Sequence, residues 1–236
     1  MLWLRYEHMF ASVSHLQPRP TLDPKLLARV RPVAAASARV LPVAPALESL
    51  FGSRGLQRGS TVRITAPRGG GGSTLALTVL SAPSAAGHWC GVVGMADPGV
   101  AGMVGLGIDL RRVVFVPAPG TAWASVVGEL IDGADMVLLR CDQQVAHPIA
   151  RNLVAKARDR QVTLVIVTST PQQWPLPSDV ELSISDATWS GVDGGYGHFL
   201  SRRATVSASG RRGAVREHIA ALWLPSSDGA VAAADW

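Results

Sequence analysis

The stretch that decides the fold is VRITAPRGGGGSTLALTVL, residues 62–80. Residues 62–65 predict a buried strand, residues 66–72 a glycine-rich loop, and residues 73–80 a helix that begins directly after the loop. Strand, glycine-rich loop and helix in this order are typical of a phosphate-binding loop. There, backbone N–H groups and the positive end of the helix surround phosphate oxygens.

The loop departs from the pattern G-x-x-x-x-G-K-[ST] that nucleotide-binding loops follow. Gly71 and Ser73 match the second glycine and the hydroxyl, but Ala66 stands at the first glycine and Gly72 at the lysine. Two interpretations stay open: an empty loop, or a loop in which Arg68 folds back to replace the lysine. The degenerate loop comprises Ala66, Pro67, Arg68, Gly69, Gly70, Gly71, Gly72, Ser73 and Thr74.

Short, continuous apolar runs alternate with helical patterns along the chain, which is typical of a parallel sheet covered by helices on both faces. Past Pro171, apolar and polar residues alternate instead, which predicts an antiparallel extension. We therefore expect an α/β fold with a mostly parallel sheet. The predicted strands are 62–65, 89–93, 113–116, 136–139, 162–167, 180–184, 204–208 and 219–224, and the predicted helices 25–30, 46–51, 73–80, 98–106, 123–131 and 149–158.

The composition fits a single soluble domain with appendages. The 236 residues are 47% hydrophobic and 17% charged, which excludes a disordered chain or a coiled coil. Two cysteines, Cys90 and Cys141, lie in apolar runs and are expected to be buried and reduced. There is no zinc-type spacing, no 18-residue apolar run and no secretory signal, so we expect a cytoplasmic protein without metal or membrane.

The chain divides into four expected parts. They are a basic N-terminal arm with a short helix (1–44), the α/β core (45–178), the antiparallel extension (179–225) and a flexible C-terminal tail (226–236).

An ordered set of segments across residues 45–225 resembles the RecA-type ATPase core. More narrowly, it is similar to the RecA-like accessory proteins ImuA and SulA, and above all to the actinobacterial ImuA-like (ImuA-prime) mutasome component. The resemblance rests on segments 55–60, 63–67, 75–77, 106–113, 197–203 and 222–225. It implies a RecA-like core.

The resemblance also indicates where an active ATPase carries its catalytic groups. The lysine position is Gly72, the water-polarising glutamate falls on Ala96, and the magnesium-supporting aspartate on Arg140. Phosphoryl transfer depends almost entirely on charge placement, and an arginine at the third position repels the metal. We therefore expect a catalytically inactive core with no cofactor.

The function implied by the resemblance is that of a scaffold in DNA-damage-induced (SOS) translesion synthesis and mutagenesis. Its expected partners are an ImuB-like, Y-family-related protein and an error-prone C-family DNA polymerase, near the nucleoid when DNA is damaged. Two alternatives stay open: an ATPase that uses Arg68 with Asp97 or Asp142, and a SulA-like inhibitor of cell division.

Direct DNA binding is expected to be weak or indirect, because loops 141–147 and 169–178 carry no Lys or Arg. Basic residues gather instead around the strand at 204–208. They form either a patch for phosphate backbones or the charged rim of a solvated edge strand. These residues are Arg202, Arg203, Arg211, Arg212 and Arg216.

Four tryptophans, Trp174, Trp189, Trp223 and Trp236, lie in the last third of the chain. Some of them must belong to the core. The terminal Trp236 follows a small acidic stretch, and is either an anchor for a partner groove or part of a frayed end.

Overall fold

The computed structural model describes residues 39–52, 55–96, 99–193, 196–210 and 217–234. The strands are β1 (Val40–Leu41), β2 (Leu56–Gln57), β3 (Thr61–Thr65), β4 (Cys90–Val93), β5 (Val113–Val116), β6 (Met136–Cys141), β7 (Thr163–Thr168), β8 (Val180–Asp193), β9 (Tyr196–Ser209), β10 (His218–Trp223) and β11 (Ala232–Ala233). The α-helices are α2 (Glu48–Phe51), α3 (Gly72–Ala85), α4 (Val100–Gly105), α5 (Trp123–Gly133) and α6 (His147–Asp159). The predicted helix at 25–30 lies outside the described residues.

Within the described residues, one sheet of nine strands has the order β11-β10-β9-β8-β3-β7-β6-β4-β5, and β1 pairs with β2 separately. β3 lies in parallel between β7 and β8, and the strands from β7 to β5 are also parallel. From β8 to β11 the pairing is antiparallel. This confirms the predicted class, an α/β fold with a mostly parallel sheet and an antiparallel C-terminal extension.

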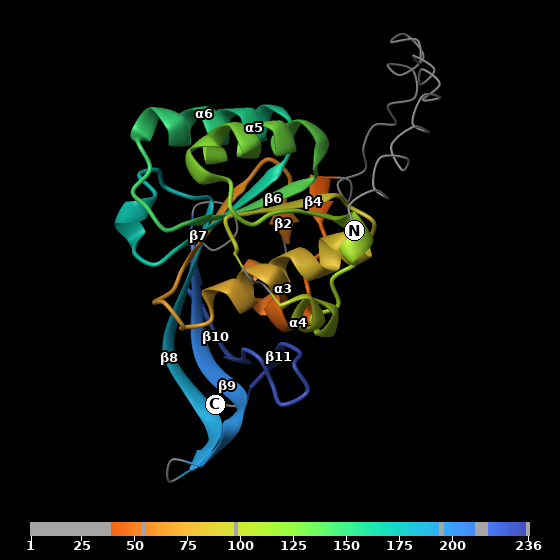
Figure 1. Ribbon diagram of the computed structural model, residues 1–236, viewed down its shortest axis with the longest axis vertical. Helices are drawn as coiled ribbons and strands as arrows, with labels where there is room; N and C mark the ends of the chain where they lie inside the picture. The colour runs from red at the N-terminus through yellow and green to blue at the C-terminus, as the bar shows by residue number, and fades with distance from the viewer. Residues whose placement is uncertain (1–38, 53–54, 97–98, 194–195, 211–216, 235–236) are drawn as a thin grey trace, which may run out of the picture. The chain divides into compact units, whose positions relative to one another are not determined.

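Helices cover both faces of the parallel part: α3 and α4 lie on one side, α5 and α6 on the other (Figure 1). Side chains of a strand point alternately to the two faces. In β6, Met136 and Leu138 join the core under α3, whereas Val137 and Leu139 pack with α5 and α6. Burial on both faces explains why these strands are continuous apolar runs. None of the described helices is long and apolar enough to cross a membrane.

The antiparallel hairpin is longer than the sequence predicts. The predicted strands 180–184 and 204–208 are parts of β8 and β9, which have 14 residues each. Their outer halves extend beyond the part of the sheet that the helices cover (Figure 1). Register shifts between Ser185 and Thr188 and between Ser190 and Val192 interrupt the alternation. The alternation of apolar and polar residues that predicts a strand is therefore lost in the outer halves, although β8 and β9 continue there.

The segment after residue 225 is expected from sequence to be a flexible tail. In the structure, Ala232 and Ala233 pair with Trp223 and Leu222 of β10. The N–H of Ser226 donates to the carbonyl of Ala230 at 2.8 Å. A turn and a short edge strand therefore attach this segment to the sheet.

The two cysteines are buried and free, as predicted. Burial, followed by a nearby aspartate charge, raises the pKa of both thiols to about 12. Because only the thiolate reacts, we expect native Cys90 and Cys141 to react with iodoacetamide at pH 8 at least ~100-fold more slowly than in the unfolded chain. Mass spectrometry with and without denaturant measures this. Equal labelling in both states would show that the thiols are accessible.

Candidate functional site

The glycine-rich loop joins β3 to α3 at the carboxyl edge of the sheet. The N–H of Ala66 donates to the carbonyl of Thr168 in β7 at 3.1 Å, and the N–H of Gly70 closes a turn onto the carbonyl of Pro67 at 2.9 Å. Gly71 is the N-cap of α3 and has a φ of 101°, a conformation that favours glycine. The loop thus has the expected geometry of strand, turn and helix N-terminus.

The two departures from the nucleotide-binding pattern belong together. A Cβ atom at Gly72 would lie 2.9 Å from the Cβ of Ala66 and 3.5 Å from Cγ1 of Val167. Every side chain except glycine begins with this carbon, so no lysine can stand at position 72 while Ala66 keeps its place. The methyl group at the first glycine position therefore accounts for the glycine at the lysine position.

We expect Gly72→Ala to destabilise the protein by about 1–2 kcal/mol, because the clash outweighs alanine's better helix propensity. In the Ala66→Gly background the same change is expected to be neutral or stabilising. Gly102→Ala in α4, where no atom lies near the added Cβ, is the matched control and is expected to stabilise by up to about 1 kcal/mol. Urea unfolding measures all four variants. If the changes in the free energy of unfolding caused by Ala66→Gly and Gly72→Ala simply add in the double variant, the clash between positions 66 and 72 is contradicted.

Arg140 of β6 lies directly beside the loop. Its Nη1 donates to the hydroxyl of Ser73 at 2.9 Å, and its Nε donates to Asp142 at 3.3 Å. Ser73 is the residue at the magnesium-binding hydroxyl position. A positive charge therefore lies where the resemblance places an acidic group and a magnesium ion in an active ATPase, as the sequence predicts for Arg140.

Arg68 does not replace the missing lysine. Its side chain is largely exposed, and its Nη2 lies 3.7 Å from the carboxylate of Asp142, which also holds Arg140. The structure therefore offers no support for the interpretation in which Arg68 folds back over the loop.

A second arginine from outside the loop that contacts it is Arg202 of β9. Its Nη1 donates to the carbonyl of Gly69 at 2.8 Å and its Nη2 to the hydroxyl of Thr74 at 3.4 Å. Only 5% of the residue is exposed, and the guanidinium carbon lies 4.7 Å from the ring centroid of Trp189. The sequence grouped Arg202 with Arg203 as surface residues. The structure separates them: Arg203 is exposed, and Arg202 points inward to the loop.

The other predicted positions contribute less. Ala96 is exposed just past β4, so it adds no charge to the site. Arg211, Arg212, Arg216 and Trp236 lie outside the described residues, as does Asp97.

Two cavities meet at Arg140. One, of about 140 Å³, is lined by the loop, Thr168, Arg140 and Arg202. The other, of about 420 Å³, lies beyond the ends of β4, β5 and β6 and includes Trp123 and Asp142. In the part of the chain that the structure describes, no group of three or more His, Cys, Asp or Glu residues is placed to hold a metal ion.

Residues 49–175 match the family described as the MT3502 N-terminal domain. This range contains the loop and Arg140 but ends before the β8–β9 hairpin and Arg202. The chain is also similar to an uncharacterized protein of Mycobacterium tuberculosis, Rv3395c, with 37% identity over 97 residues. The match covers 41% of this chain and 48% of the relative, so it spans about half of the relative's length.

Proposed function

The chain belongs to the family of the MT3502 N-terminal domain, and we propose that it acts by binding other proteins and not by hydrolysing ATP. The observation that carries this proposal is Arg140, whose Nη1 lies 2.9 Å from the hydroxyl of Ser73. Magnesium would have to bind next to this guanidinium, which repels it. Since charge placement supplies most of phosphoryl-transfer catalysis, the arrangement supports a core without a hydrolytic role.

As partners we infer the ImuB-like protein and the error-prone C-family polymerase of DNA-damage-induced translesion synthesis. The ordered motifs that resemble actinobacterial ImuA-like proteins support this assignment, and a mycobacterial relative is compatible with it. In this role the protein works in the cytoplasm, joins the nucleoid when DNA is damaged, and contacts DNA indirectly.

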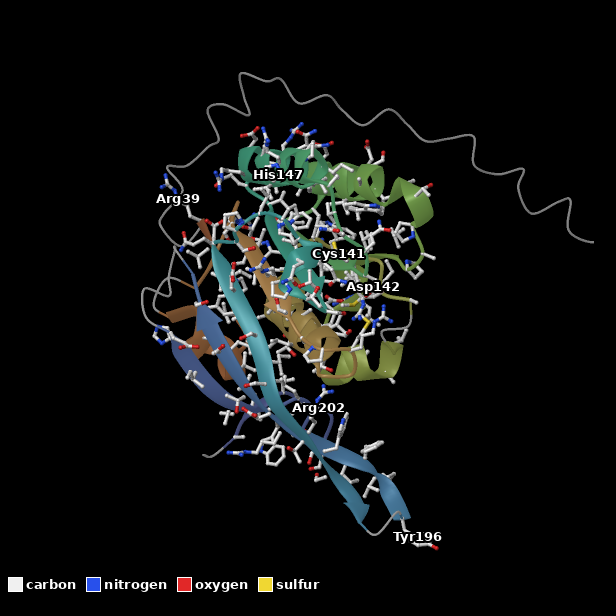
Figure 2. All side chains as sticks on the ribbon, turned by 90° about the vertical axis from the view of Figure 1, so that its left-hand side faces the viewer. Arg39, Cys141, Asp142, His147, Tyr196 and Arg202 are labelled. Atoms are coloured by element: carbon white, nitrogen blue, oxygen red, sulfur yellow. The ribbon has the colours of Figure 1, made fainter. Side chains whose placement is uncertain are left out.

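The surface that we assign to the ImuB-like partner is the outer part of the β8–β9 hairpin. Tyr196 is 86% exposed and Phe199 63% exposed, and Figure 2 shows Tyr196 at the far end of the hairpin. Clustered, exposed aromatic side chains are typical of interface centres. We call this set the hairpin surface; it comprises Trp189, Val192, Tyr196, Phe199 and Leu200.

Two measurements test the proposed function. The purified protein is expected to show no ATP turnover with Mg²⁺, with or without single-stranded DNA, and turnover that Arg68→Ala abolishes would contradict the scaffold role. Capture from cells with damaged DNA is expected to retain the ImuB-like protein and the polymerase. Filamentous growth on overproduction without DNA damage, together with failure to retain these partners, would favour inhibition of cell division instead.

A further inference from the structure

Arg202 is a buried cation with no anionic partner among the described residues. No carboxylate among the described residues forms an ion pair with it, and its Nε atom has no hydrogen-bond partner there. Burial lowers the pKa of its guanidinium, which reflects the cost of keeping this charge away from water. Trp189 covers the guanidinium, and Figure 2 shows Arg202 where the hairpin joins the body of the sheet.

The surroundings of Arg202 add positive charge. The guanidinium contacts Gly69 and Thr74, so it lies at the N-terminus of α3, a helix of 14 residues whose dipole is positive at this end. Arg140 lines the same cavity. Among the described residues, Arg140 forms an ion pair with Asp142, and the same carboxylate also lies 3.7 Å from Nη2 of Arg68. The described residues around the cavity therefore carry a surplus of positive charge.

The cavity between these groups suits a small oxyanion. Its volume of about 140 Å³ is below the range of about 300–1,000 Å³ that is typical of sites for larger organic ligands. Ser73, Thr74 and Thr168, each with a hydroxyl group, line it together with Arg140 and Arg202. The hydrogen bond from Arg202 Nη2 to Thr74 is long, at 3.4 Å, so this nitrogen can turn to a stronger acceptor. Guanidinium groups match the geometry of phosphate oxygens.

We propose that this cavity binds a phosphate group without a divalent cation, held between Arg202, Arg140 and the N-terminus of α3. Arg202 comes from β9, outside the family match at 49–175, and takes the place of the lysine that Ala66 excludes. None of the described residues that line the cavity is a carboxylate or a histidine, so they offer the phosphate no general base, and we assign the site to binding and not to hydrolysis. The proposal does not depend on the identity of the protein partners.

Titration calorimetry of the full chain with inorganic phosphate in EDTA, at constant ionic strength, tests the site. We expect saturable binding that 5 mM Mg²⁺ leaves unchanged within about twofold. Arg202→Gln and Arg140→Gln are each expected to weaken it about tenfold or more, the effect of losing a charge-assisted hydrogen bond. Arg203→Gln, the exposed neighbour, is the matched control and is expected to have no effect. Binding that requires Mg²⁺, or that survives Arg202→Gln, would overturn the proposal.

A second measurement keeps the test valid if Arg202→Gln lowers stability. Phosphate is expected to raise the unfolding temperature of the wild type and of Arg203→Gln. It is expected to leave the unfolding temperatures of Arg202→Gln and Arg140→Gln unchanged. ATP and ADP in EDTA distinguish the source of the phosphate group. Nucleotide binding that Arg202→Gln weakens supports the site and assigns it to a nucleotide's phosphate. If neither phosphate nor nucleotide binds or stabilises the wild type, the proposal is wrong, whereas the scaffold function would still stand.

Discussion

Replacing Tyr196 and Phe199 together with alanine is expected to weaken binding of the ImuB-like partner by about a hundredfold or more. Both side chains are largely exposed on the hairpin surface. Aromatic residues at interface centres typically contribute 2 kcal/mol or more each, and about 1.4 kcal/mol corresponds to a tenfold change in affinity. Calorimetry or surface plasmon resonance with the purified partner measures the change.

These two residues are preferable to Trp189, whose ring packs on Arg202 and so links the hairpin surface to the glycine-rich loop. The Phe199 ring packs at a tilt against Trp189, with 5.0 Å between the ring centroids, and Phe199 is largely exposed, so its loss is expected to cost at most about 1 kcal/mol of stability.

The matched control is Ile149→Ala. Ile149 is another exposed apolar residue. It belongs to α6, which lies away from the β8–β9 hairpin (Figure 1). Its replacement is expected to leave the affinity unchanged. If the double variant binds within threefold of the wild type, the partner contacts another surface.

The core could be predicted from sequence because its signals are local. The strand, loop and helix at 62–80 follow from an apolar run, four glycines and a helical pattern, and β5 has the predicted bounds Val113–Val116. Strands buried on both faces are mostly apolar, so their apolar runs locate them in the sequence, although β6 continues past the predicted end through Arg140 to Cys141. The hairpin beyond Ile184 gave no such signal, since side chains near its end are exposed on both faces.

The role of Arg202 was missed although the sequence contains a hint. The predicted strand at 204–208 has Ala204, Val206 and Ala208 on its buried face. Because side chains of a strand alternate between its faces, Arg202, two residues before Ala204, lies on the same face, and Arg203 lies on the opposite one. What the pattern could not reveal is that Arg202 on this face contacts the glycine-rich loop, more than a hundred residues earlier in the chain. That contact depends on β8 pairing with β3, which brings the hairpin beside the loop.

Trp174→Ala is expected to cause the largest loss of stability, about 3–5 kcal/mol. Trp174 is 2% exposed and belongs to the core beneath α5 and α6. A short 3-10 helix (Pro171–Gln173) precedes it, and a capping box between Thr170 and Gln173 holds the backbone that leads into Trp174. Its backbone carbonyl accepts a hydrogen bond from Arg63 at 3.5 Å. Because these contacts hold the backbone at Trp174 in place, we expect the surrounding core not to close over the space that the indole ring leaves, so its removal creates a cavity.

Trp174→Phe separates the apolar contribution of this ring from its polar one. The indole Nε1–H is buried without a hydrogen-bond partner among the described residues, which costs about 1–3 kcal/mol. Phenylalanine removes that penalty while keeping most of the apolar surface, so we expect a loss of at most about 1.5 kcal/mol. Urea unfolding followed by far-UV circular dichroism compares both variants with the wild type. A phenylalanine variant as unstable as the alanine variant would mean that the N–H is satisfied in solution, and that the hydrogen bond supports the core as much as the ring does.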